Sequence, residues 1–354
     1  MAIRVLPQNR QGFNTALLRS EEEQLLLNIV RMQYSDRPYF LNVDNITASN
    51  ALTISSNTTG YGLSKTRQSF APQGYSIQNV YNIAPNVAYN DAPTVFYSPL
   101  QGEKFTRHIL SPISMEDIYL LIGSGWSIAR VLRITVQHLG DIPNAPGVSR
   151  PSTKHLPHYQ SFVAFAHYLR RLELQDIIDL KSGKVGKILS LDIVPKKHYL
   201  HSAMVKKLYS MLNVNNKYDR IKLVIEKETD GDITKGNVLI LQPRSFIGIL
   251  YYLSRSVDIS SDDIKKGLVI IPKTPHGAPF DWHDVTSGMM HIRSTSTQIP
   301  TNASVAVFYR DRWFYVADND TDSKITMAMI EQLYSLHAGD AVSKGPLASF
   351  SLAT

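Results

Sequence analysis

Apolar residues recur at the spacing of an α-helix near the start of the chain. Ser20 and Glu23 form a capping-box pattern, in which a hydroxyl and a carboxylate satisfy free backbone amides, so a helix is predicted to begin at Ser20. Pro38 predicts the end of this helix near Asp36, because the residue before a proline disfavours the helical conformation. The apolar stripe of the helix comprises Leu25, Leu26, Ile29 and Met32.

From Tyr39 to about Ser98 the pattern changes to short apolar–polar alternation. Residues 45–98 hold only three charged side chains among many Asn, Ser, Thr, Gln and Tyr, and stretches such as Leu52-Thr53-Ile54-Ser55 predict strands or long β-arms. Two interpretations stay open: a surface sheet with long turns, or an arm that packs on other subunits, since the segment lacks the usual protection against edge pairing. A membrane-inserted hairpin fits less well, because the apolar stretches are shorter than the roughly 9–11 residues of a spanning strand. The residues expected at a subunit interface are Tyr61, Phe70, Tyr75, Ile77, Tyr81 and Tyr89.

Helical spacing returns after Pro99. Ser114 and Asp117 predict a helix start, and Gly123 and Gly125 separate that helix from the next one. The apolar face of the second helix is predicted to contain Ile128, Val131, Leu132, Thr135 and Leu139.

The second half of the chain mixes both periodicities. A helical stripe comprises Phe162, Phe165, Ala166, Leu169 and Leu172, and further helices are predicted at 202–212, 243–255 and 322–337. Strands are predicted at 188–194, 220–228, 236–241, 267–271, 288–295, 303–309 and 312–317. The segment from Tyr309 to Trp313 predicts a tight hairpin between the last two of these strands.

These patterns predict an α+β fold. A helical and β-arm N-terminal half is followed by a mixed α/β C-terminal half with a largely antiparallel sheet. A cluster of prolines at 143–157 predicts a linker between residues 1–142 and a mixed domain at 158–339, with a flexible tail at 340–354. A length of 354 residues agrees with roughly two domains.

Composition narrows the chemistry. The chain has no cysteine, which excludes disulfides, thiolate metal sites, iron–sulfur clusters and cysteine nucleophiles. Its 37 Lys and Arg against 30 Asp and Glu give a net charge of +7, which is modest for a nucleic-acid binder and would equally suit an anionic membrane surface. The segment Met1–Gly12 has no signal-peptide pattern, and no window reaches the roughly 18–20 apolar residues of a transmembrane helix, so a soluble or peripheral chain is expected.

Acidic and histidine clusters were considered as candidate metal or catalytic sites. Asp318, Asp320 and Asp322 resemble a calcium loop, but an EF-hand needs Gly at its sixth position and an acid at its twelfth, where this chain has Ser323 and Met329. These acids are therefore predicted to start the following helix, where they complement its dipole.

Histidines give a weaker signal for chemistry. His283 lies between Asp281 and Asp284 and could form an acid–base pair with one of them, although adjacent residues of this kind are typical of a solvated turn. His155, His158 and His167 have no HExxH pattern and no suitably interleaved acid. His198 and His201 could share a helical face, but Lys196 and Lys197 beside them disfavour a cation. No catalytic, cofactor-binding or metal residue is therefore assigned.

Basic pairs could contact phosphates but are expected to be ordinary solvated faces. They are Lys196/Lys197, Lys206/Lys207 and Lys265/Lys266, and acids such as Asp262 and Asp263 lie between them. No Walker A loop, GxSxG elbow or dinucleotide-binding glycine pattern occurs. Nucleic acid and small-molecule substrates are therefore not expected as partners.

Several stretches, in order and with specific spacing, carry a family resemblance that runs from about residue 9 to 339. They are Asn9-Arg10, Phe13–Leu18, Glu23–Met32, Tyr97–Phe105, Leu110–Ile113, Leu121–Ser127, Arg130–Leu132, Ser245–Ser254, Tyr309–Asp318 and Asp322–Lys324. Together they resemble a family of proteobacterial envelope lipoproteins. None of these motifs is catalytic.

The resemblance implies a place at the bacterial envelope. The chain is similar to Legionella-type accessory components of the Dot/Icm type IV secretion outer-membrane core complex, which implies a non-enzymatic, structural role in protein transport without a cofactor. The implied partners are other secretion-complex proteins in a large oligomeric assembly on the periplasmic side of the outer membrane. The chain departs from the family because it has neither the leader nor the cysteine through which such proteins are lipidated.

Two alternatives stay open. The first is a periplasmic hydrolase or metal-dependent enzyme that uses the Asp281/His283/Asp284 or the Asp318/Asp320/Asp322 cluster. The second is a binder of nucleic acid or of an anionic surface.

Overall fold

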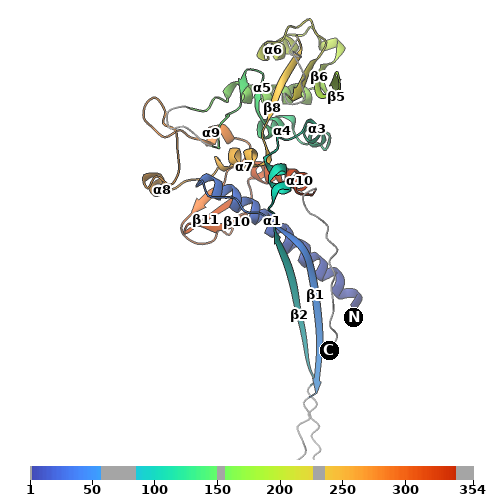
Figure 1. Ribbon diagram of the computed structural model, residues 1–354, viewed down its shortest axis with the longest axis vertical. Coiled ribbons are helices and arrows are strands. Elements are labelled where there is room, and N and C mark those ends of the chain that lie inside the picture. Colours follow the sequence, from blue (N-terminus) through green and yellow to red (C-terminus); the bar gives the residue numbers. More distant parts are fainter. Residues whose placement is uncertain (1, 57–84, 150–155, 226–235, 340–354) are drawn as a thin grey trace, which may run out of the picture. The chain divides into compact units, whose positions relative to one another are not determined.

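The computed structural model describes residues 2–56, 85–149, 156–225 and 236–339, with the backbone alone for 2–10, 44–56, 85–95 and 338–339. It divides into two compact units, one of residues 1–40 with 101–354 and the other of residues 41–100. The larger unit mixes α-helices with mostly antiparallel sheets (Figure 1), and one pair of its strands is parallel. The predicted α+β class is confirmed.

A group of helices forms the centre of the larger unit around α7 (Phe246–Ser254). Phe246, Ile249 and Leu250 of this helix are fully buried, and α7 contacts helices on several sides. Its helical partners are α1 (Ala2–Gln33), α2 (Glu103–Leu110), α4 (Ile128–Thr135) and α10 (Thr321–Gly339). An apolar helix that contacts helices on several sides is a core element.

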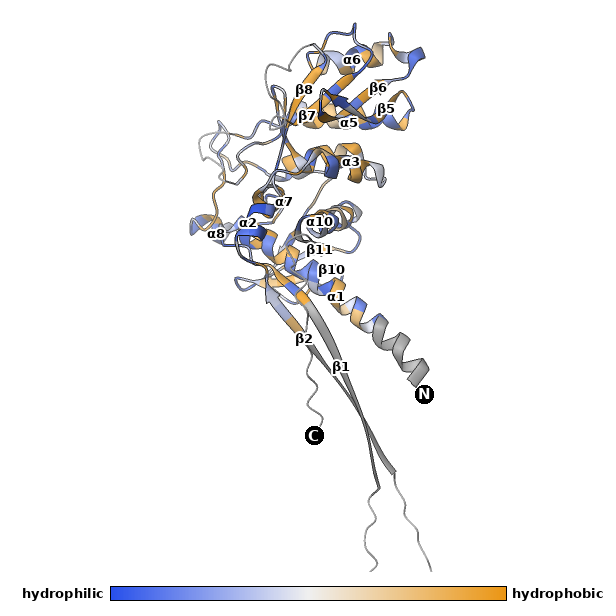
Figure 2. Ribbon diagram, turned by 45° about the vertical axis from the view of Figure 1, so that its right-hand side comes forward, coloured by the Kyte–Doolittle hydropathy of each residue, from blue (hydrophilic) through white to orange (hydrophobic). Residues whose placement is uncertain are grey.

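A six-stranded sheet forms a second core in the same unit, with strand order β4-β3-β8-β7-β6-β5. Its strands are β3 (Val136–Leu139), β4 (Ile142–Pro143), β5 (Ile178–Val185), β6 (Ile188–Pro195), β7 (Ile221–Ile225) and β8 (Val238–Pro243). Leu191, Ile193 and Leu223 are buried near its middle, and orange segments mark the apolar residues of β6 and β8 in Figure 2. Helix α3 (Met115–Gly123) contacts the sheet at β6, α5 (Gln160–Leu174) contacts it at β4 and β5, and α6 (Ala203–Met211) contacts α5.

A three-stranded antiparallel sheet packs against α1. It comprises β9 (Arg293–Thr295), β10 (Ala303–Tyr309) and β11 (Arg312–Ala317). Two short helices, α8 (Ser261–Lys265) and α9 (His283–Thr286), lie between α7 and β9 in the chain, and a third, η1 (Lys197–Tyr199), follows β6. The predicted hairpin is confirmed, since Tyr309 pairs with Arg312. Arg310 and Asp311 both have positive φ, as a two-residue hairpin turn requires. Arg310 also forms an ion pair with Asp36 at 2.8 Å, which joins this turn to the end of α1.

Two strands form the smaller unit. β1 (Leu41–Ser56) and β2 (Pro85–Pro99) pair antiparallel along their whole length, from Leu41 opposite Pro99 to Ser56 opposite Pro85. The register of these two strands shifts at one place, a bulge between Val43 and Asn45. The predicted long β-arms are confirmed as strands, and we call this unit the ribbon.

Arginines buried in the larger unit hold backbone segments together. Arg244 is 3 % exposed and donates to the carbonyl oxygens of Arg133 and Ile134, both at 3.1 Å, and to those of Val136 and Asn144. These contacts satisfy the carbonyls that the end of α4 leaves free and place a cation at the negative end of its dipole. Burial lowers the pKa of Arg244 to about 10, so the side chain stays charged at neutral pH.

Arg133 and Arg255 act in the same way. Arg133 is fully buried and donates to the carbonyls of Val285 and Ser287 at 3.1 and 2.9 Å. Arg255 donates to the carbonyl of Val148 and to Gln33 of α1. These buried guanidinium groups therefore serve as hydrogen-bond donors that fix loops against helices.

Three local predictions are wrong. The first helix begins at Ala2 instead of Ser20, because Glu23 pairs with Arg19 one turn earlier and does not cap. The helix of 128–139 ends at Thr135, because the following residues pair with β8 as strand β3.

Residues 267–271 form no strand, although four consecutive apolar residues favour one. Leu268 and Ile270 are 37 % and 42 % exposed, and Pro272 follows them directly. The 288–295 prediction holds only for β9, at its end. The predicted domain division at 143–157 stays a prediction, and the tail at 340–354 lies outside the described residues.

Candidate functional site

Two histidines and one aspartate from three separate segments meet in the larger unit. Asp258 follows α7, His283 is the first residue of α9, and His291 precedes β9. The ligand atoms of these three side chains lie within 4.8 Å of one another. It is the one group of at least three metal-ligating side chains that the described residues contain.

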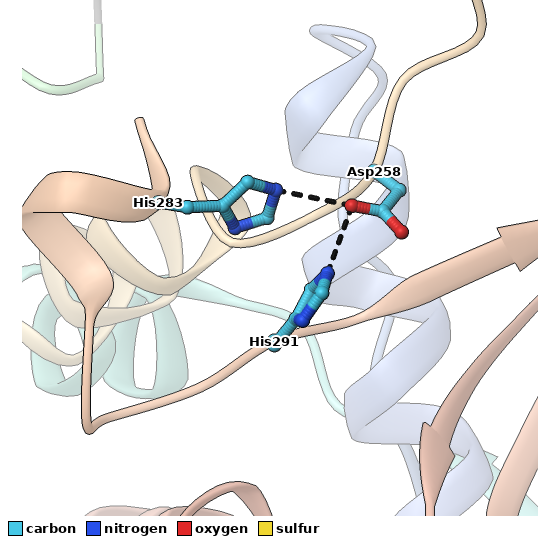
Figure 3. A group of neighbouring side chains, drawn as sticks. All are labelled: Asp258, His283 and His291. Atoms are coloured by element: carbon cyan, nitrogen blue, oxygen red, sulfur yellow. Dashed lines mark hydrogen bonds and ion pairs between the residues drawn. The ribbon is translucent and has the colours of Figure 1, made fainter. Parts of the chain in front are cut away.

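Both histidine rings point at the same carboxylate oxygen (Figure 3). Nε2 of His283 lies 3.0 Å and Nε2 of His291 lies 2.9 Å from Oδ1 of Asp258. The two rings stand edge to face with centroids 4.5 Å apart. The three side chains are 34–40 % exposed, so water reaches the cluster.

The backbone holds each of the three residues in place. The amide of Asp258 donates to the carbonyl of Ile292 at 2.8 Å, and the amide of His291 donates to the hydroxyl of Ser323 at 2.9 Å. The amide of His283 donates to the carboxylate of Asp281 at 2.9 Å. The cluster is therefore anchored at all three corners.

Electrostatics within the cluster favour the charged carboxylate. Burial alone would raise the pKa of Asp258, but the hydrogen bonds from His283 and His291 hold it well below its usual range. The hydrogen bond to Asp258 raises the pKa of His283, against the effect of burial. A carboxylate held in its charged form beside two imidazole rings suits either proton exchange or the binding of a cation.

The sequence suggests an acid–base pair between His283 and a neighbouring aspartate, but in the structure the ring of His283 has a distant partner. His283 faces Asp258, which lies 25 positions away, and Asp281 accepts the backbone amide of His283 rather than its ring. Sequence inspection missed Asp258 and His291, because only the parallel bridge between Val257 and Ile292 brings them together.

The acids before α10 act as the helix start that their pattern predicts. Asp320 accepts the backbone amide of Ser323 at 3.1 Å and its hydroxyl at 2.7 Å. Asp318 pairs with Lys324 at 2.7 Å, and Asp322 pairs with the buried Arg130 at 2.5 Å. The three carboxylates therefore face three different partners.

The basic pairs considered for phosphate binding have local contacts. Lys196 pairs with Asp176, Lys265 lies 4.0 Å from Asp262, and Lys207 lies over the ring of Tyr168. His167 lies 3.5 Å from Arg133, and burial together with that charge lowers its pKa. The described contacts of these basic pairs are separate and local, and they give no support for a shared phosphate-binding surface.

The residues predicted at a subunit interface fall in or beside the ribbon. Tyr61, Phe70, Tyr75, Ile77 and Tyr81 lie outside the described residues. Tyr89 lies in β2 with its backbone opposite Leu52. Their assignment to an interface stays a prediction.

No helix within the described residues is both long and apolar enough to cross a membrane. No protein-family model, curated protein or solved structure matches the chain. The function is therefore inferred from the chain's own geometry and from the resemblance of its sequence motifs to the envelope lipoprotein family.

Proposed function

We propose that this protein is a non-enzymatic structural component of a bacterial envelope assembly, and that the assembly is the outer-membrane core complex of a type IV secretion system. The observation that carries the proposal is the ribbon, a pair of strands of 16 and 15 residues with no third strand among the described residues. Strands of globular proteins usually have about 3–10 residues, and a lone two-stranded hairpin is marginally stable at best in water. A ribbon roughly 50 Å long therefore gains stability from a surface that it binds.

Both strands of the ribbon are edge strands. From Asn45 to Ser56 and from Pro85 to Phe96 each strand pairs on one side only within the described chain. Natural proteins protect such edges with charged residues, especially lysine, and this stretch holds Asp91 alone. Low charge keeps the desolvation cost of a protein interface small.

The two edges differ in their suitability for pairing. β1 contains no proline, whereas β2 contains Pro85, Pro93 and Pro99, each without an amide hydrogen to donate. The outer edge of β1 is therefore the better template for a strand from another subunit.

The apolar–polar alternation along β1 and β2 also favours an interface. In the register, Ile46 stands opposite Val95, Leu52 opposite Tyr89 and Ile54 opposite Val87. These positions share one parity, and the positions of the other parity are mostly small or polar residues. This parity is the more apolar one, interrupted at Asn50 opposite Asp91, and such a pattern is typical of an element that is buried on assembly.

The family resemblance supplies the identity of the assembly. It implies partners among the secretion-complex proteins and a place on the periplasmic side of the outer membrane. The contacts of the buried arginines are consistent with a structural role. Arg244 and Arg255 donate their hydrogen bonds to backbone carbonyls and to Gln33. Such an interior rigidifies a scaffold.

A matched pair of variants tests the proposal. In the short-ribbon variant, Asn-Gly replaces residues 50–91 and joins Ser49 to Ala92, which are paired in the register. In the control, Asn-Gly replaces residues 57–84 and leaves all pairs of β1 and β2 in place. Each is expressed in place of the full chain and recovered from envelope fractions by affinity purification.

We expect the full chain to recover other secretion-complex proteins, and the short-ribbon variant to recover at least about 10-fold less of them. The variant without residues 57–84 keeps every strand pair but lacks Tyr61, Phe70, Tyr75, Ile77 and Tyr81, so its recovery separates the paired strands from these predicted interface residues. Equal recovery by the two variants would exclude the paired strands as the assembly surface. A full chain that purifies from envelopes as a lone monomer would overturn the proposed function itself.

A further inference from the structure

We propose that Asp258, His283 and His291 form a binding site for a divalent transition metal, with Zn²⁺ as the ion that the donors fit best. Two imidazole nitrogens and one carboxylate oxygen are ligands that zinc takes in proteins. Calcium and magnesium prefer sites made of oxygen atoms alone. The proposal is independent of the role of the ribbon.

The distances are close to those that a zinc ion imposes. Zinc binds nitrogen and oxygen at about 2.0–2.2 Å, so ligand atoms on a tetrahedral ion are about 3.3 Å apart. The two nitrogen–oxygen distances at Asp258 are 3.0 and 2.9 Å, and all ligand atoms lie within 4.8 Å of one another. Side-chain rotations that move the three ligand atoms by a few tenths of an ångström to about 1 Å would make room for the ion.

The charges around the cluster suit a cation. With both rings neutral, the three side chains carry one negative charge in total. Among the described residues, no lysine or arginine forms an ion pair with Asp258, whose ion-pair partners are the two histidines. Asp281 and Asp284 lie near His283 and add negative potential there.

The three ligands come from backbone that is already held in position. Asp258 and His291 lie on segments joined by the Val257–Ile292 bridge, and His283 begins a helix whose first amide is bonded to Asp281. Anchored ligands reduce the ordering that metal binding requires.

A metal ion here would connect segments that have little regular structure of their own. Between Arg255 and Thr295 the chain contains two short helices, α8 and α9, and the three-residue strand β9. Three protein ligands leave at least one coordination position open, and the partial exposure of the side chains directs that position to water. The site therefore combines a structural cross-link with a position at which a water molecule binds.

Metal titration of the full chain tests the site. The purified protein is stripped with a chelator and titrated with Zn²⁺ by calorimetry, and Co²⁺ serves as a visible-light probe, because its absorption bands report nitrogen and oxygen ligation. We expect one ion per chain and a rise in the unfolding temperature with Zn²⁺. Absence of saturable binding would overturn the proposal.

Four variants locate the site. We expect Asp258→Asn and His291→Gln each to weaken Zn²⁺ binding by at least about 10-fold. The matched controls Asp262→Asn and His276→Gln change exposed residues of the same region and should bind as the unaltered protein does. Unchanged binding by both cluster variants would place the metal elsewhere.

A measurement on the unaltered protein covers the case in which the cluster variants do not fold. Diethyl pyrocarbonate modifies accessible imidazoles, and the modified positions are read by mass spectrometry. Zn²⁺ should slow modification of His283 and His291 at least about 10-fold and leave the exposed His276 unaffected. Equal modification rates with and without Zn²⁺ would overturn the proposal.

Discussion

The six-stranded sheet and the ribbon are both dominated by antiparallel pairing, yet they reach stability by different means. The sheet joins strands of at most eight residues, and its central residues, such as Leu191 and Leu223, are buried by helices of the same chain. The ribbon joins strands of 16 and 15 residues and has no third strand within the described chain. Long local pairing can thus form a strand pair without a third strand, and an isolated pair of this kind is marginally stable in water.

The largest expected effect is a loss of stability in the larger unit, which contains the six-stranded sheet. Arg244→Met removes the donors that hold the ends of α4 and β8 together. The carbonyls of Ile134 and Asn144 lose this donor, whereas those of Arg133 and Val136 keep the side chain of Asn144. We expect the free energy of unfolding to fall by about 3–5 kcal/mol, measured by urea denaturation.

The control for this change is Arg171→Met, on the exposed side of α5. It should alter the free energy of unfolding by less than about 0.5 kcal/mol. Equal effects of the two substitutions would show that the buried contacts of Arg244 contribute nothing specific.

A smaller effect concerns pH and the packing of α10 on α1. Glu331 has a buried carboxylate oxygen without a hydrogen-bond partner among the described residues, and burial, aided by the charges of Glu22 and Glu21, raises its pKa to about 7. The folded state therefore holds this proton more tightly than the unfolded state. The associated stability is present below about pH 4.5 and is lost as the pH rises through 7.

Glu331→Gln should remove this pH dependence. We expect the unaltered protein to lose about 1–2 kcal/mol more than the variant between pH 5 and 8, after discounting for screening by water. Glu116→Gln, on the exposed side of α3, is the control and should follow the unaltered protein. Parallel pH profiles for all three proteins would contradict the assignment of the effect to Glu331.

The smallest expected effect belongs to the ribbon. The short-ribbon variant removes pairs from Asn50–Asp91 outward and leaves the larger unit unchanged in sequence. Its free energy of unfolding, followed by the fluorescence of Trp126, Trp282 and Trp313, should stay within about 0.5–1 kcal/mol of that of the full chain. A loss as large as that of Arg244→Met would show that the ribbon stabilises the larger unit.

Sequence patterns predicted the elements whose signals are local. The turn at Arg310 and Asp311 was predictable because two alternating strands flank it, and the start of α10 because acids gather before an apolar stripe. Strands in the charge-poor, alternating segment were predictable, but their pairing with each other along their whole length was not.

Features set by distant contacts were not predictable. Strand β3 continues a helical stripe in sequence and becomes a strand because β8 offers it an edge. Asp258, His283 and His291 carry no motif spacing, and their meeting depends on a single bridge between two loops. The sequence offers only the immediate neighbours Asp281 and Asp284 as candidate partners of His283, whereas its ring faces Asp258.

The position of α1 also determines the order in which this protein can fold. Its buried residues, such as Leu26 and Ile29, pack in a helix whose contacts are with α7, β10 and α10. All three partners begin at or after Phe246, so more than two hundred residues separate the helix from them. Such distant contacts form late, and a chain that emerges from its N-terminus would hold the apolar face of this helix uncovered until the last third of the chain has been released. During synthesis the apolar face of the first helix is therefore open to a chaperone.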